Sequence, residues 1–272
     1  MNNTEQLAFF GLKSRPFDKG LSDANLWLPP SKMEVVDDIV EATEALHWSM
    51  LTGEPGAGKT SVLRAVRARL SNEGYRLTYS HNSTLGRRDF YRQICHTLGL
   101  KPQATAAAVF YAITTRVTEL ARDNIRPVLF IDEAHLLHQD VLDHLHILGN
   151  FEWDNAPLLT IILSGLPDLE DRLVMQRNRS LYSRLHRRVR LSPLKPEDAI
   201  SYIQHRLRVA GADNKDYFTS DALGLLYEAA GGNLRDIDRL ASIAMANAAR
   251  AGQHLIERGA ISSAIQQDTR QR

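Results

Sequence analysis

The sequence lacks most features of exported or membrane-spanning proteins. Its single cysteine, Cys95, excludes an internal disulfide framework and fits a reducing compartment. No apolar run reaches the length of a membrane span, and the first residues lack the basic-then-apolar layout of a signal peptide. The 33 Lys and Arg residues nearly balance 32 Asp and Glu residues, so any contact with nucleic acid must come from local basic patches. We therefore expect a cytoplasmic protein without a membrane segment.

The segment LTGEPGAGKTSVLRAVRARL, residues 51–70, places a glycine-rich turn before an amphipathic helix. The spacing Gly53-x4-Gly58-Lys59-Thr60 fits the Walker A pattern, in which backbone amides and the positive end of the helix dipole surround phosphate groups. Lys59 supplies a cation for the terminal phosphates, and Thr60 supplies a hydroxyl for a magnesium ion. The segment therefore predicts binding of ATP and Mg2+ by Gly53, Pro55, Gly56, Ala57, Gly58, Lys59, Thr60 and Ser61.

The alternative for this segment is an ordinary strand–helix turn that binds nothing. Residues 49–52 predict a short strand, and Leu63, Val66 and Leu70 align on one face of a helix. A strand before the turn and a helix after it are the context that a phosphate-binding loop requires, so they favour nucleotide binding.

Two carboxylates end a second apolar run, PVLFIDEAH. Because buried acids need partners, we expect Asp132 to hold the magnesium ion, together with Thr60 and through water. Glu133 can then act as the catalytic base that polarises the attacking water. A solvated pair at a strand end is the alternative, and the Walker A segment upstream favours the catalytic hypothesis.

Strand and helix signals alternate through the middle of the chain, and only helix signals follow. Segments such as PVLFID and APLLTIILSG are continuously apolar, which is typical of buried parallel strands. We predict an α/β P-loop domain, a parallel sheet flanked by helices, over residues 31–192 and a small all-helical lid domain over residues 193–272. Residues 1–30 are predicted as an irregular lead, with Phe10 and Phe17 among its apolar anchors, that packs on the nucleotide site.

Together these motifs resemble those of AAA+ ATPases. The resemblance runs from about residue 8 to residue 268 and rests on the Walker A segment, LFIDEAH, a strand ending in a polar residue, SRLHRRV and GGNLRDI. FFGLKSRPF and IDEAHLL resemble more narrowly the ExeA-like group, which includes the secretion ATPase ExeA and transposition ATPases of the TniB, TnsC and MuB kind. The resemblance implies ATP hydrolysis by an AAA+ P-loop domain with a helical lid.

The resemblance also implies roles for two isolated polar residues. Ser164 ends the strand LLTIILS, where a sensor residue detects the terminal phosphate. Arg235 in GGNLRDI matches the arginine that reaches from the helical lid to the nucleotide. The alternatives are a serine in a turn and a solvated helix arginine.

The stretch between Arg172 and Arg190 is rich in arginine. Arg184 matches the arginine finger of the family, which acts across a subunit boundary on the neighbour's phosphoryl group. This role implies a homo-oligomer, either a hexameric ring or a helical filament. A solvated basic face is the alternative, and the rivals for the finger are Arg177, Arg179, Arg187 and Arg188.

A basic loop follows the second predicted strand, in HNSTLGRRDFYR. In AAA+ assemblies the corresponding loop faces the central channel, so Arg87 and Arg88 are predicted to contact DNA phosphates, with Ser83 or Thr84 adding hydrogen bonds. The alternative is an ordinary basic helix start. The histidines of HLLHQDVLDHLH do not complete a metal site, and His135 stands out because it follows Glu133 closely.

The preferred hypothesis is a DNA-binding ATPase that regulates DNA transposition, with double-stranded DNA and a transposase or target-selector protein as partners. The alternative is an ExeA-like assembly factor of a general secretion pathway. We expect transposition, because the secretion relative needs a membrane segment and a further exported domain that these 272 residues do not contain. A nucleotide switch without turnover is a third hypothesis, which the Asp132–Glu133 pair disfavours.

Overall fold

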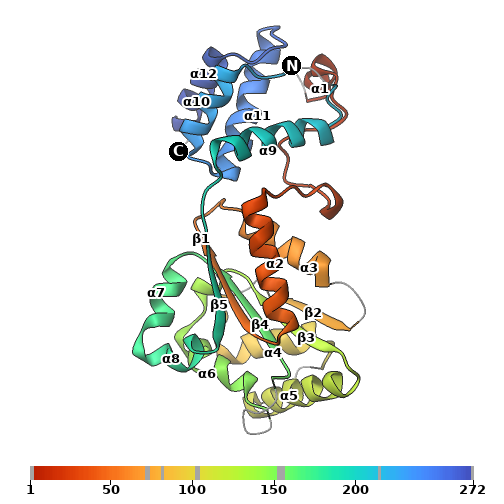
Figure 1. Cartoon of the computed structure of the whole chain (residues 1–272), viewed down its shortest axis with the longest axis vertical. Coiled ribbons are helices and arrows are strands. Elements are labelled where there is room, and N and C mark those ends of the chain that lie inside the picture. The colour runs from red at the N-terminus through yellow and green to blue at the C-terminus, as the bar shows by residue number, and fades with distance from the viewer. Residues whose placement is uncertain are drawn as a thin grey trace. The chain divides into compact units, whose positions relative to one another are not determined.

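The computed structural model of the chain consists of two compact units (Figure 1). One comprises residues 31–54 and 59–191 and contains the sheet; the other comprises residues 1–30, 55–58 and 192–272 and is helical. The structure describes residues 3–70, 74–80, 83–101, 105–151, 157–213 and 216–270.

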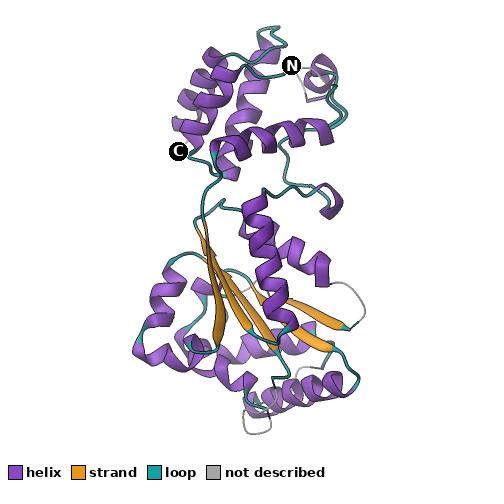
Figure 2. Ribbon diagram, in the orientation of Figure 1, coloured by secondary structure: helices purple, strands orange, loops and turns teal. Residues whose placement is uncertain are grey.

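The first unit, the sheet unit, contains a five-stranded parallel sheet with the strand order β2-β3-β4-β1-β5 (Figure 2). Every residue of β1 and β4 is buried, which requires helices on both faces of the sheet. The prediction of a parallel sheet flanked by helices, followed by a helical C-terminal region, is confirmed. The strands are β1 (Trp48–Gly53), β2 (Tyr75–Ser80), β3 (Arg126–Ile131), β4 (Thr160–Gly165) and β5 (Leu185–Leu191).

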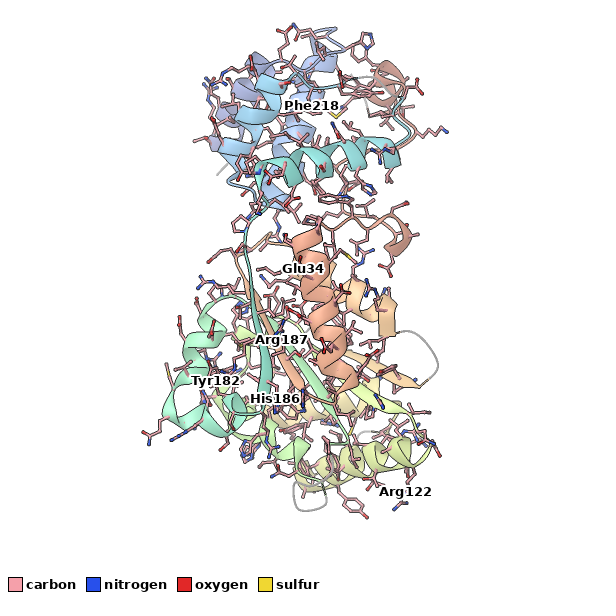
Figure 3. The ribbon with its side chains drawn as sticks, viewed as in Figure 1. Glu34, Arg122, Tyr182, His186, Arg187 and Phe218 are labelled. Carbon is pink, nitrogen blue, oxygen red and sulfur yellow. The ribbon has the colours of Figure 1, made fainter. Side chains whose placement is uncertain are left out.

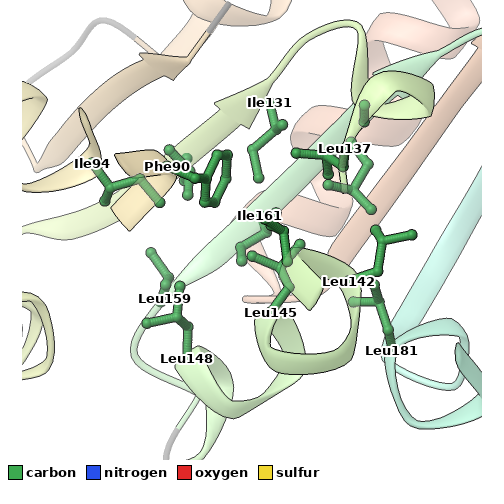
Figure 4. Packing of buried hydrophobic residues seen from close by; sticks show 14 of the residues in the cluster. Phe90, Ile94, Ile131, Leu137, Leu142, Leu145, Leu148, Leu159, Ile161 and Leu181 are labelled. Atoms are coloured by element: carbon green, nitrogen blue, oxygen red, sulfur yellow. The ribbon is translucent and has the colours of Figure 1, made fainter. Parts of the chain in front are cut away.

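The core of the sheet unit forms where apolar helix faces meet β3 and β4 (Figure 4). Phe90 and Ile94 lie on one face of α4, as their spacing predicts, and pack with Ile131 and Ile161. Cys95 is a buried core residue. The helices of this unit are α2 (Pro30–Glu44), α3 (Lys59–Leu70), α4 (Arg87–Thr97), α5 (Ala106–Arg122), η2 (Ala134–Leu136), α6 (Gln139–Leu145), η3 (His146–Gly149), α7 (Asp168–Val174), η5 (Gln176–Asn178) and α8 (Arg179–Tyr182).

The second unit, the helical unit, packs around small residues of α11. Asn233 caps this helix, because its Oδ1 accepts hydrogen bonds from the backbone N–H groups of Arg235 and Asp236. Thr219 caps α10 in the same way through Ala222 N–H. The helices of this unit are α1 (Asn3–Phe10), η1 (Asp23–Asn25), α9 (Pro196–Val209), α10 (Ser220–Ala230), α11 (Leu234–Arg250) and α12 (Arg258–Thr269).

The N-terminal lead is not irregular throughout, because it begins with helix α1. Phe10 and Phe17 are buried in the core of the helical unit. The buried guanidinium of Arg206 fixes the following loop by donating to the carbonyl oxygen of Pro16 at 2.5 Å. Sequence patterns did not reveal this association, since it joins residues far apart in the chain.

Candidate ATP-hydrolysis site

The predicted phosphate loop follows β1 and ends where α3 begins at Lys59. Gly56 and Gly58 have φ angles of +81° and +93°, a conformation that other residues adopt only with strain. The backbone N–H groups of the first helical turn and the positive end of the helix dipole favour an anion at the start of α3. Glycine at these two positions thus allows the loop to take the shape that surrounds phosphate groups.

Lys59 is buried. Its ammonium group donates hydrogen bonds to the carbonyl oxygens of Gly53, at 2.6 Å, and Glu54, at 3.1 Å. These bonds compensate for the burial of the charge and hold the cation at the turn. Thr60 and Ser61 follow in the first turn of α3, with the side chain of Thr60 exposed.

Asp132 lies immediately after β3, where the ends of three strands meet. Its Oδ1 accepts a hydrogen bond from Ser164 Oγ at 2.9 Å, and its Oδ2 accepts one from Tyr79 Oη at 2.8 Å. The Ser83 hydroxyl donates to the backbone carbonyl of Asp132 at 2.6 Å. The structure therefore brings together the predicted metal ligand and the predicted sensor, Ser164, in one hydrogen-bonded group.

Tyr79 is a member of this group that sequence analysis missed. Burial, the hydrogen bond to Asp132 and the nearby negative charges raise the pKa of its hydroxyl, which therefore remains a donor. The alternation of buried and exposed residues along β2 was the available signal. Tyr79 lies near the end of the strand, on the face opposite to that of buried Thr78. Its partner depends on the pairing of β2 with β3, which no local pattern specifies.

Glu133 has left-handed backbone angles, φ +50° and ψ +36°. Its backbone N–H donates to Asp132 Oδ1 at 3.0 Å, while its side chain is half exposed. Such a conformation is unusual for a residue other than glycine and is often found at functional sites. The carboxylate is accessible to the water that a catalytic base must polarise.

The magnesium prediction fits Asp132 and Thr60, which both belong to the sheet unit. Within the sheet order, β4 lies between β3 and β1, so the strand ends that carry Asp132, Ser164 and the start of the phosphate loop are neighbours. The carboxylate of Asp132 and the hydroxyl of Thr60 are oxygen ligands of the kind that Mg2+ requires. In the described part of the chain, no cluster of three His, Cys, Asp or Glu side chains forms a separate metal site.

Several arginines between Arg172 and Arg190 have partners within the sheet unit. Figure 3 labels one of them, Arg187, on β5. Arg188 lies over the ring of Tyr182, 3.8 Å from its centroid, and Arg187 pairs with Asp38 of α2. Arg184 donates to the side-chain oxygen of Asn150. These contacts hold Arg187 and Arg188 against the sheet unit, and the choice of Arg184 as the finger stays a prediction.

Among the rivals for the finger, Arg177 forms two hydrogen bonds with the carboxylate of Asp143, at 2.9 and 2.5 Å. This ion pair lowers the pKa of Asp143. Arg179 is exposed at the start of α8. In the helical unit, Arg235 is exposed in the first turn of α11.

The predicted DNA-contact loop lies beside helix α6. Arg87 N–H donates to the carboxylate of Asp140 at 3.3 Å, and its guanidinium contacts the imidazole of His144. His138 donates to the carbonyl oxygen of Thr84 at 2.9 Å. Arg88 is exposed. Residues 81 and 82 of the quoted loop lie outside the described residues.

Residues 48–173 match the family model of the AAA domain. With the parallel five-stranded sheet, this match shows an AAA+ P-loop fold, which is consistent with ATP hydrolysis. Among the helices described, none is long and apolar enough to cross a membrane.

The chain is similar to a curated protein and to solved structures. It is 32% identical over 259 residues to the General secretion pathway protein A of Aeromonas hydrophila, and the match covers 94% of this chain but 47% of that protein. The chain thus spans about half the length of this relative.

Two solved structures share the fold. Cdc6p from Pyrobaculum aerophilum has a TM-score of 0.69 at 16% identity, covering 89% of this chain and 67% of its own. A chain from Drosophila ORC bound to DNA has a TM-score of 0.71 at 17% identity, covering 97% and 67%. At these identities the similarity shows the fold.

Proposed function

We propose that this chain is the ATP-hydrolysing part of a secretion-pathway protein. The observation that carries the proposal is the 32% identity to the General secretion pathway protein A, which extends over both units of the chain. The sequence favoured DNA transposition, with secretion as the alternative. The curated relative carries a secretion name, so the comparisons favour the alternative.

In the proposed reaction, the glycine-rich loop and Lys59 bind the phosphates of ATP. Thr60 and Asp132 would hold a magnesium ion, which would neutralise charge on the phosphates. Ser164 and Tyr79 orient the carboxylate of Asp132 by their hydrogen bonds. Glu133 orients and polarises the attacking water, and an arginine from a neighbouring subunit, Arg184 in our assignment, stabilises the transferring phosphoryl group.

Chromosomal variants in the native host test this function. Glu133→Gln removes the base and keeps the groups that bind ATP, so we expect secreted proteins to accumulate inside the cell. The matched control is Glu34→Gln, because Glu34, labelled in Figure 3, is exposed on α2 and is not among the residues assigned to ATP or magnesium. Normal secretion in the Glu133→Gln strain, with a changed transposition frequency of a marked element, would favour the transposition hypothesis.

A second candidate function is ATP-dependent binding of double-stranded DNA by a homo-oligomer. The adjacent Arg87 and Arg88 at the start of α4 favour it, because guanidinium groups bind phosphates irrespective of sequence. Several loops in one assembly would add their contacts, so binding is expected to require ATP and to weaken steeply with salt. A salt titration of the Arg87→Ala, Arg88→Ala double variant tests this, since loss of the basic loop should flatten the salt dependence.

A further inference from the structure

His135 lies between the carboxylate of Glu133 and the end of strand β4. Its side chain is 13% exposed, whereas that of Glu133 is 51% exposed. The imidazole Nδ1 is 3.5 Å from Glu133 Oε2 and 3.4 Å from the backbone nitrogen of Leu166. One ring nitrogen therefore faces both the proposed base and the segment that follows Ser164.

His135 fits closely against Gly165, the last residue of β4. A Cβ atom at residue 165 would lie 3.1 Å from the backbone nitrogen of His135 and 3.4 Å from its Nδ1. A side chain at this position would thus press on His135 and move it away from the strand end. The close contact depends on glycine at residue 165.

Arg172 holds the backbone at His135 and two residues after it. Its guanidinium donates to the carbonyl oxygens of His135 and Leu137, the latter at 2.7 Å. Neither bond involves the imidazole ring. Substitution of the ring therefore leaves this support in place, and its effect on turnover reports on the side chain of His135.

We propose that His135 is a positioning residue for Glu133, which couples the orientation of the base to the end of β4. The proposal rests on the proposed role of Glu133 in ATP hydrolysis. A half-exposed glutamate side chain has many accessible orientations, and a fixed neighbour is needed to restrict it to those that meet the attacking water. Ser164 contacts Asp132 from the same strand end, so a shift of this segment on phosphate binding would move His135 and redirect the carboxylate.

Steady-state hydrolysis and ATP binding by His135 variants test the proposal. His135→Phe keeps the ring volume but lacks Nδ1, so we expect kcat to fall about 10- to 100-fold through misplacement of the base. The Kd for ATP should stay within about twofold of wild type, because the phosphate-binding groups are unchanged.

Two polar variants separate positioning from packing. His135→Asn places its amide group near the position of Nδ1 and should recover most of the lost kcat. His135→Gln places its amide near Nε2 and should recover little. Equal turnover of the Asn, Gln and Phe variants would overturn the proposal, because packing alone would then explain the effect.

ATP hydrolysis by wild type and by Glu133→Gln, measured beside the His135 variants, shows whether this proposal or the proposed function has failed. If wild type hydrolyses ATP, Glu133→Gln does not, and His135→Phe matches wild type, the positioning role is overturned while the ATPase function stands. If wild type fails to hydrolyse ATP as an assembled oligomer, the proposed function is overturned and the role of His135 with it.

Discussion

At the residue scale, the site combines a half-exposed carboxylate, that of Glu133, with a buried and hydrogen-bonded one, that of Asp132. Asp132 accepts hydrogen bonds from Ser164 and Tyr79, whereas the side chain of Glu133 is half exposed. Two adjacent acids in one motif are thus suited to different tasks, because their surroundings differ. Hydrogen bonds fix the orientation of the Asp132 carboxylate, as the proposed metal ligand requires, and the Glu133 side chain is accessible to water.

Glu133→Gln is expected to bind ATP but to lose nearly all turnover, by a factor of about 100 or more, because the amide cannot accept the proton from water. Initial rates of phosphate release, together with ATP binding at equilibrium, measure this. Complexes formed with ATP should also persist longer in the variant. Wild-type rates of hydrolysis in Glu133→Gln would show that another group is the base.

Lys59→Ala is expected to weaken ATP binding itself. Its ammonium lies at the turn, bonded to the carbonyl oxygens of Gly53 and Glu54, and is the cation predicted for the terminal phosphates. Calorimetric titration with ATP and magnesium measures the Kd, and a loss of roughly tenfold or more is expected from removal of a charge-assisted contact. Unchanged affinity would contradict the assignment of this loop to phosphate binding.

At the element scale, α9 and α11 of the helical unit are joined by a polar group inside an apolar core. Asp238 on α11 accepts a hydrogen bond from Tyr202 Oη at 2.8 Å, and its carboxylate is 3.5 Å from the guanidinium of Arg206 on α9. Arg206 also holds the loop of the N-terminal lead. This group therefore connects two helices and the lead.

Burial raises the pKa of Asp238 to about 6, although Arg206 and the Tyr202 hydroxyl oppose the shift. An unfolded aspartate has a pKa of about 4, so between about pH 4 and pH 6 the folded chain binds more protons than the unfolded chain. Stability from this group is therefore complete below about pH 4 and declines as the pH rises to about 6, by up to about 3 kcal/mol.

Asp238→Asn removes the titrating group while keeping an acceptor for Tyr202. We expect the decline in the free energy of unfolding between about pH 4 and pH 6 to be smaller in this variant than in wild type. Urea unfolding over this range, followed by helical circular dichroism, measures the difference. The same pH dependence in both proteins would show that burial does not raise the pKa of Asp238.

At the scale of the whole molecule, the arginine finger predicts that one subunit completes the site of another. Turnover per subunit should then rise with protein concentration, and Arg184→Ala should abolish the rise while ATP still binds. Arg184→Ala and Lys59→Ala should each be inactive alone, and a mixture should regain part of the activity. In such a mixed pair, the Arg184→Ala subunit supplies an intact ATP-binding site and the Lys59→Ala subunit supplies the arginine.

The matched control for this mixture is Arg188→Ala combined with Lys59→Ala, because the guanidinium of Arg188 packs on Tyr182 of its own subunit. Loss of Arg188 alone should leave the concentration dependence intact. If mixing with Lys59→Ala gave no recovery although both variants are folded, Arg184 would not act across a subunit boundary.

The sequence by itself determined the elements whose signals are local. Gly53, Gly58, Lys59 and Thr60 predict the phosphate loop because backbone freedom, charge and helix start occur within a few residues. The continuously apolar segments of β3 and β4 also predict their structure locally. A strand that is buried on both faces has apolar residues at consecutive positions, so the short segment by itself predicts a buried parallel strand. These signals sufficed for the fold class, and they placed Asp132 and Glu133 correctly at the end of a buried strand.

Only the tertiary structure decided which distant residues meet. The order β2-β3-β4-β1-β5 places Tyr79 and Ser164 on opposite sides of Asp132, and β4 brings Leu166 to the imidazole of His135. The N-terminal lead likewise joins the helical unit through Arg206. Such pairings depend on the free energy of packing the whole unit, and because no short segment contains both partners, local periodicity and propensity cannot specify them.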